Sequence, residues 1–193
     1  MKKASFILLA LLLYVVNLNA KFLYNEYLVS PKASKVIENI GSELKSKCGI
    51  NGYLITTNSK IERGVSIYDF LKEYKDLRKP FVAIVFAPNS KRIHVVANPK
   101  ELLKGLDKDK ILDYAIKIIA SKDGNSLQSK YDVGLVQSFS EMADEVAKSK
   151  GVTLNSTIKD SGHWVITILN ILIIFGSLIV IWIYFIRPIF KRK

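Results

Sequence analysis

FVAIVFAPNSKRIHVV, residues 81–96, carries the strongest structural signal in the chain. Its first six residues are apolar throughout, which is typical of a central strand that is covered on both faces. Pro88, Asn89 and Ser90 have the chemistry of a turn, and the run RIHVVA returns from them. The segment therefore predicts a β-hairpin inside a sheet.

Helical and extended patterns alternate on both sides of this hairpin. Ser30-Pro31 predicts the start of the first helix, because serine caps helices and proline suits the first helical position. The remaining patterns predict a helix to 47, a strand over 52–58, a short helix over 67–74, and helices near 107–121 and 131–150. Strands that alternate with helices imply helices packed on a sheet. We therefore expect an α/β fold, a three-layer α/β/α sandwich with a small mixed sheet of three or four strands.

The end of the chain predicts one transmembrane helix. Residues 164–186 contain no charged side chain, and a helix of that length would extend about 35 Å, enough to cross a ~30 Å hydrocarbon core. The basic tail 187–193 would mark the cytoplasmic side. One face of this helix carries small and polar residues, Thr167, Asn170, Gly176 and Ser177. Such a face can support a weak homodimer, and a single span also tolerates it.

The start of the chain has the layout of a secretory signal peptide. Lys2 and Lys3 precede an apolar run over 4–16, and Ala20 offers a small residue for cleavage. Whether or not it is cleaved, residues 21–162 would lie outside the cytoplasm. The cleaved form would be a single-pass protein of the inner or plasma membrane, and an uncleaved run would act as a signal anchor with its basic end inside. The expected organisation is a signal peptide (1–20), an exported domain (21–151), a juxtamembrane linker (152–163), a transmembrane helix (164–186) and a cytoplasmic tail (187–193).

The net charge of +12 does not indicate a nucleic-acid-binding protein. The exported segment carries all 17 acidic residues and 23 of the 29 basic ones, and lysines outnumber arginines 24 to 5 over the chain. Proteins that recognise nucleic acids favour arginine and clustered basic faces. We expect no nucleic-acid partner. Solvated surface lysines are the plain interpretation, and attraction to anionic lipid headgroups or acidic polymers is the alternative.

Acidic residues at the start of the predicted helix 107–121 are the candidates for metal binding. Asp107 and Asp109 could contribute carboxylate oxygens to a Ca²⁺ or Mg²⁺ site, which needs several such ligands. Acids in a first helical turn also stabilise the helix through its dipole, so capping is the plainer alternative. The sequence contains no zinc-protease, nucleophile-elbow or phosphate-loop motif. No catalytic residue can be named.

Four stretches resemble the TPM-domain family of membrane-associated or lumenal domains. They are LVSP (28–31), GYLITTN (52–58), the hairpin 81–96 with its APN turn, and KYDVGL (130–135). A signal peptide, a domain and a C-terminal span in that order are also common in this family. The resemblance covers residues 28–151 and implies an α/β/α fold.

The resemblance implies two different kinds of activity. Some TPM-domain proteins are described as phosphatases or calcium-binding, and others act in the assembly or repair of membrane complexes. The family's acid before its third main helix corresponds to Asp107, and its conserved glycine to Gly134. Its glycine-rich turn is replaced by ANPKE (97–101), and its acids near the mature N-terminus are reduced to Asn25 and Glu26. We therefore expect a non-catalytic interaction or assembly domain with membrane-protein neighbours. The alternative is a divalent-metal-dependent phosphatase or other hydrolase of the cell envelope.

Overall fold

The computed structural model of the chain describes residues 21–159 and residue 182. Residues 21–158 belong to one compact unit. The predicted signal peptide lies outside the described residues, as does the predicted transmembrane helix except for residue 182. Among the helices of the described part, none is long and apolar enough to span a bilayer.

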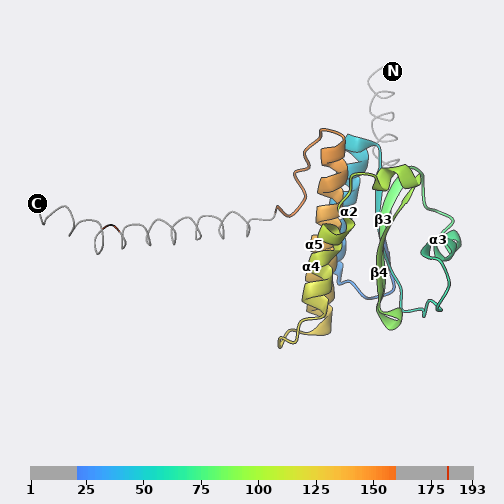
Figure 1. Cartoon of the computed structure of the whole chain (residues 1–193), viewed down its shortest axis with the longest axis vertical. Coiled ribbons are helices and arrows are strands. Elements are labelled where there is room, and N and C mark those ends of the chain that lie inside the picture. Colours follow the sequence, from blue (N-terminus) through green and yellow to red (C-terminus); the bar gives the residue numbers. More distant parts are fainter. Residues whose placement is uncertain (1–20, 160–181, 183–193) are drawn as a thin grey trace, which may run out of the picture. The chain divides into compact units, whose positions relative to one another are not determined.

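Four strands form one mixed sheet in the order β1-β2-β3-β4 (Figure 1). The first three run parallel and the fourth runs antiparallel to the third. Their bounds are β1 Leu23–Asn25, β2 Asn51–Thr56, β3 Phe81–Ala87 and β4 Arg92–Asn98. The prediction of an α/β fold with a small mixed sheet is confirmed, and so is the central hairpin. The sequence patterns did not predict β1, because three residues are too few to show a period.

The long helices pack on one face of this sheet. They are α2 (Pro31–Cys48), α4 (Lys108–Ile119) and α5 (Leu127–Ser149). The short helix α3 (Ile67–Phe70) lies on the other face and continues as the 3₁₀ turn η2 (Leu71–Glu73) (Figure 1). Two further 3₁₀ turns, η3 (Pro88–Ser90) and η4 (Lys100–Leu103), flank β4.

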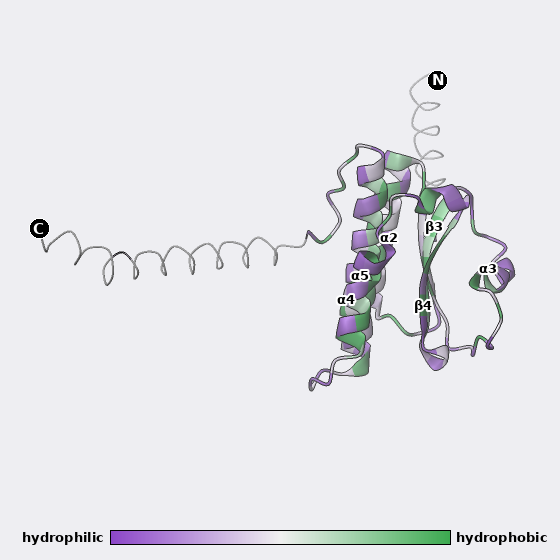
Figure 2. Cartoon of the chain, in the orientation of Figure 1, coloured by the Kyte–Doolittle hydropathy of each residue, from purple (hydrophilic) through white to green (hydrophobic). Residues whose placement is uncertain are grey.

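The strand β3 is buried on both faces, as its sequence predicts. Val82, Ile84 and Phe86 belong to the core beneath the long helices, whereas Ala83 and Val85 belong to the core on the α3 side. Figure 2 shows the contrast between this apolar strand and the helices, which alternate hydrophobic and hydrophilic residues. The helices therefore bury one stripe each, and the sheet buries both faces.

The two connections between the parallel strands lie on opposite faces. β1 connects to β2 through α2, and β2 connects to β3 through α3. Both connections move to the next strand in the same direction across the sheet. Two such crossover connections have opposite handedness when they cover opposite faces. One of the two is therefore left-handed, although about 98% of such connections are right-handed. The second connection takes residues 57–80 across the α3 face of the sheet to the amino end of β3.

Helix α5 begins at Leu127, four residues before the predicted start near Tyr131. The hydroxyl of Ser126 accepts the backbone N–H of Ser129, which caps the helix at that point. Residues 121–129 are rich in turn-forming residues, so the sequence predicts a loop over this whole segment. The cap serine, not the first apolar residue, sets the boundary.

Residues 152–158, the first part of the predicted linker, pack on the domain. Leu154 is fully buried in the core beneath the long helices. The Glu43 carboxylate of α2 accepts the backbone N–H groups of Asn155 and Ser156 at 2.9 and 2.7 Å. The Ser140 hydroxyl of α5 accepts the N–H of Ile158 at 2.7 Å. The chain is thus fixed to the two longest helices up to the end of the compact unit.

Candidate functional site

Asp107 lies at the N-cap of α4. Its carboxylate accepts the backbone N–H of Lys110 at 3.0 Å. Asp109 occupies the first turn, and Asp113, one turn further on, pairs with Lys117 at 2.6 Å. Within residues 21–159 no three histidine, cysteine or acidic side chains gather as a metal-binding group. Capping accounts for the position of Asp107, and the Ca²⁺ or Mg²⁺ site stays a prediction.

Asn25 and Glu26 lie at the carboxyl end of β1, the end at which open α/β sheets bind ligands. Here their polar atoms serve the fold. The Glu26 carboxylate accepts the Thr57 hydroxyl at 3.0 Å and the Asn58 N–H at 2.6 Å. The Asn25 side chain accepts the N–H of Leu28 at 2.9 Å. These bonds tie the loop after β1 to the end of β2.

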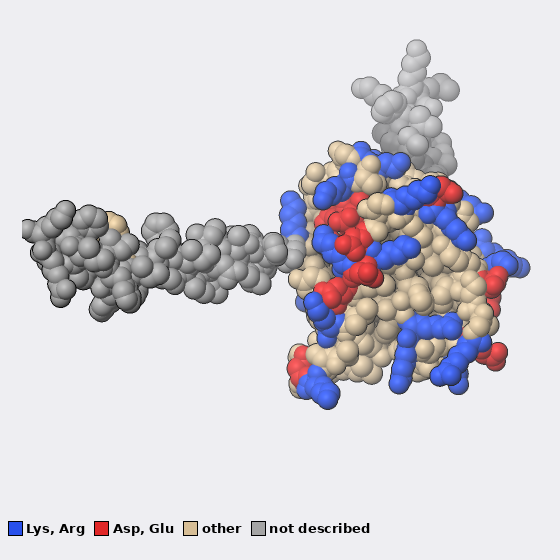
Figure 3. Space-filling model, in the orientation of Figure 1, with Lys and Arg blue, Asp and Glu red and all other residues tan. Residues whose placement is uncertain are grey.

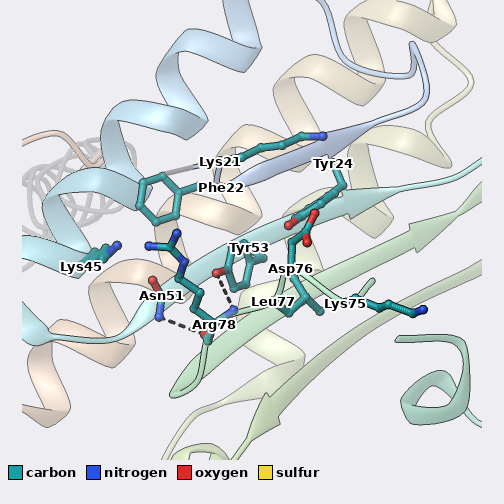
Figure 4. Close-up of a pocket in the computed structure, with 10 residues that line it drawn as sticks. All are labelled: Lys21, Phe22, Tyr24, Lys45, Asn51, Tyr53, Lys75, Asp76, Leu77 and Arg78. Atoms are coloured by element: carbon teal, nitrogen blue, oxygen red, sulfur yellow. Dashed lines mark hydrogen bonds between the residues drawn. The ribbon is translucent and has the colours of Figure 1, made fainter. Parts of the chain in front are cut away.

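A cavity of about 400 Å³ opens at the opposite end of the sheet, and we call it the amino-end pocket (Figure 4). Four parts of the chain meet there: the start of β1, the last turn of α2, the start of β2, and the connection that precedes β3. Its lining residues are Lys21, Phe22, Tyr24, Lys45, Asn51, Tyr53, Lys75, Asp76, Leu77 and Arg78. The connection from β2 to β3 therefore supplies one wall.

The wall beneath the amino-end pocket is aromatic. Tyr53 is almost fully buried, and its ring centroid lies 6.2, 6.0 and 5.8 Å from those of Phe22, Tyr24 and Phe81. Tilted and edge-on contacts of this kind add to the energy of burial. Phe22 can pack there because Gly41 of α2 has no side chain, since a Cβ atom at Gly41 would lie 2.5 Å from the Phe22 ring.

The backbone of Arg78 is fixed by two buried side chains. The Asn51 amide donates to the carbonyl oxygens of Arg78 and Pro80, at 3.0 Å each. The Tyr53 hydroxyl accepts the N–H of Arg78 at 3.1 Å. Burial raises the pKa of Tyr53, although the Arg78 N–H and charge oppose it, so the hydroxyl stays neutral at pH 7. The backbone of Arg78 is therefore fixed at the edge of the amino-end pocket.

The charges around the amino-end pocket are unbalanced. Four basic side chains line it, against the single acid Asp76. In Figure 4 the side chains of Lys45 and Arg78 point toward each other beside Phe22, whereas Lys75 points away. Within the described part of the chain, neither Lys45 nor Arg78 forms a salt bridge. Two cations without an acidic partner suit a carboxylate or phosphate group, to which arginine can donate two parallel hydrogen bonds.

Comparison of the chain with protein-family models and with curated proteins gave no match. The site is therefore assigned from geometry. Sequence patterns did not reveal it, because Lys45, Tyr53 and Arg78 come from three separate segments. The sequence around Asn51 indicates only a turn before a strand. In the structure Asn51 opens β2 and directs its amide toward the Arg78 backbone.

Proposed function

We propose that this chain is a membrane-tethered, extracytoplasmic interaction domain of TPM-like, three-layer architecture. It binds an acidic group of a membrane-protein neighbour in the amino-end pocket. The tether and the orientation are supported by the uncharged run 164–186 and by the basic residues at both ends of the chain. The small mixed sheet, with helices on both faces, supports the architecture.

One observation carries the binding role, the convergence of Lys45 and Arg78 above an aromatic wall. Lys45 lies in the last turn of α2, and the Arg78 backbone is fixed by Asn51 and Tyr53. Neither backbone has to be ordered when a ligand arrives, which lowers the entropic cost of binding. Charged groups that face one ligand in this way also confer specificity for its sign.

Binding is better supported than hydrolysis. The hydrolase alternative gives Asp107 and Asp109 a catalytic metal, and in the structure Asp107 caps α4. The acid of the amino-end pocket, Asp76, is exposed and stands among four basic side chains. That charge pattern favours an anionic ligand over a bound cation.

Crosslinking of the full chain in its membrane tests the proposal. Wild type and the double variant Lys45→Ala/Arg78→Ala are compared, with Lys122→Ala as the control because Lys122 is exposed and lies outside the residues that line the amino-end pocket. We expect one or more protein neighbours to crosslink to wild type and to Lys122→Ala. The double variant should lose most of this crosslinking while its abundance is unchanged, since exposed or half-exposed lysine and arginine side chains contribute little to folding.

Two results would contradict the proposal. One is the same set of neighbours in wild type and in the double variant, which would place the interaction elsewhere. The other is the recovery of anionic lipid and no protein. That result would assign the amino-end pocket to headgroups, and the crosslinking should then fall steeply with salt.

A further inference from the structure

The strand β4 forms an edge of the sheet. Within residues 21–159 its ladder partner is β3, and no other described segment is joined to the backbone of Arg92–Asn98 by a hydrogen bond. An edge strand presents a row of unpaired N–H and C=O groups. Its first half is accessible, because Arg92 and Ile93 are half-buried and His94 is exposed, whereas Val95–Ala97 are buried.

An apolar cavity of about 550 Å³ lies beside this accessible half, and we call it the edge groove. It runs between the end of β3, the start of β4 and the last turns of α4. Phe86, Ile93, Ile116 and Ile119 line it, and Ile116 is 52% exposed. Over the region of α4 and β4, Figure 3 shows an uncharged area with basic side chains along one border and both acidic and basic side chains along the other. An exposed apolar surface with a polar border is typical of an interaction site.

The basic border of the edge groove belongs to the start of β4. Lys91 and Arg92 border the cavity, although the Arg92 side chain points to the α3 side of the sheet, and in the described part of the chain neither residue forms a salt bridge. The Arg92 guanidinium donates to the carbonyl oxygen of Val65 at 3.1 Å, so it is held in place without being neutralised. The charge there favours an acidic occupant.

The alternation of side chains along β4 predicts the order of apolar and acidic residues in a segment that binds there. Ile93 packs with the core beneath the long helices, on the same side as the edge groove. Arg92 and His94 alternate with it and face the other side. A strand added to this edge would therefore present apolar side chains to Ile93 and Ile116, and acidic side chains to Arg92.

We propose that the edge of β4 and the edge groove together bind an extended segment of a partner protein by strand addition. The segment alternates apolar and acidic residues, so that main-chain hydrogen bonds supply affinity and the groove and the basic residues supply specificity. This site is separate from the amino-end pocket and does not depend on it. A second copy of this chain fits less well, because pairing β4 with β4 would bring two sets of Lys91 and Arg92 together.

A short peptide tests the proposal on the full chain in lipid nanodiscs. The probe is fluorescein-labelled Glu-Val-Glu-Val-Glu-Val with blocked ends, and the control peptide Val-Val-Val-Glu-Glu-Glu has the same composition without alternation. We expect fluorescence anisotropy to show binding of the first peptide, at least about tenfold tighter than the second. Ile116→Glu should weaken binding about tenfold or more, because it places a charge in the edge groove. Val133→Glu is the matched control, since Val133 is 53% exposed on α5, and it should bind as wild type does.

Hydrogen exchange distinguishes strand addition from simple occupation of the groove. Peptide binding should slow exchange of those backbone amides in Arg92–His94 that point away from β3, since the added strand pairs with them. Binding that leaves these amides unchanged, or equal binding of both peptides, would overturn the proposal. Sedimentation of the full chain supplies a further test. Self-association that is lost in Ile116→Glu and kept in Val133→Glu would assign the edge to a second copy.

Discussion

At the scale of single residues, several side chains that sequence patterns left unassigned hold distant segments together. Glu43 is the clearest case. Its carboxylate forms a 2.8 Å ion pair with Lys47 and also accepts the Ser156 hydroxyl and the N–H groups of Asn155 and Ser156. It therefore joins the middle of α2 to the last residues of the domain, more than a hundred positions along the chain.

The lowered pKa of Glu43 predicts that the stability of the fold depends on pH. Burial acts to raise the pKa, and the hydrogen bonds from Lys47, Ser156 and Asn155 outweigh it, so the pKa falls from 4.5 to about 2. A carboxyl group whose pKa is lower in the folded state stabilises the fold fully above its unfolded pKa. Its contribution should therefore be present above pH 4.5 and be lost as the pH falls toward 2.

We expect Glu43→Gln to lower the free energy of unfolding by about 1–3 kcal/mol at pH 7, since it removes a charged acceptor from several donors. The difference from wild type should shrink between pH 4.5 and pH 2. Pulse proteolysis of the full chain in urea, at a series of pH values, measures both. Glu101→Gln, in the exposed first position after Lys100 of η4, is the control and should change little. A difference between Glu43→Gln and wild type that is the same at neutral and at strongly acidic pH would contradict this account.

At the scale of elements, the sequence predicts best where the pattern is long or the cap is explicit. The central hairpin and the helix that starts at Ser30-Pro31 are confirmed, because an apolar run and a serine–proline cap are local signals. The missing β1 has no local signal, since its three residues become a strand only by pairing with Leu54–Thr56 of β2. The side on which a connection crosses the sheet is likewise set by tertiary packing.

Asp107 gives a prediction about the stability of α4, because its role as the N-cap can be tested separately from a role in catalysis. Asp107→Ala removes the side chain that accepts the Lys110 N–H and should lower the free energy of unfolding by about 1 kcal/mol. Asp107→Ser should stay close to wild type, because serine is an equally good N-cap. Urea unfolding of the three full-length proteins, followed by pulse proteolysis, measures the two changes.

The same variants test the hydrolase alternative. Hydrolysis of a phosphate monoester is measured with Ca²⁺, with Mg²⁺ and with a chelator. If Asp107 serves only as a cap, no metal-dependent turnover will separate wild type from either variant. Metal-dependent turnover that is abolished in both Asp107→Ala and Asp107→Ser would show that the carboxylate does chemistry that a serine hydroxyl cannot replace.

At the scale of the whole molecule, the candidate sites could not be predicted from the sequence. Each depends on segments that meet only after folding, such as the ends of β3 and α4 around the edge groove. Gly41 illustrates the difficulty. Its position within a helix looks unfavourable by propensity, and its value becomes visible only when Phe22 packs against it. Local patterns predict the architecture of layers here, while shape complementarity between distant residues forms the sites.

The charge distribution along the chain predicts its orientation in the membrane. The basic residues next to both apolar runs, Lys2 and Lys3 at one end and those of 187–193 at the other, should stay in the cytoplasm. If so, the domain of residues 21–158, with both proposed binding sites, would face the opposite side. A neighbour that binds the amino-end pocket or the edge of β4 must therefore expose its acidic segment outside the cytoplasm.

Cysteine labelling of the full chain in spheroplasts measures this orientation. Cys48→Ala removes the single native thiol, which is partly buried and whose pKa is raised by burial. Val133→Cys and Arg192→Cys are then added separately, since Val133 is exposed on α5 and Arg192 lies in the predicted tail. A maleimide that cannot cross the bilayer should label Val133→Cys in intact spheroplasts, and Arg192→Cys only after lysis. Labelling of both sites before lysis would contradict a single span. Labelling of Arg192→Cys alone would invert the orientation, and the partner's acidic segments would then have to lie in the cytoplasm.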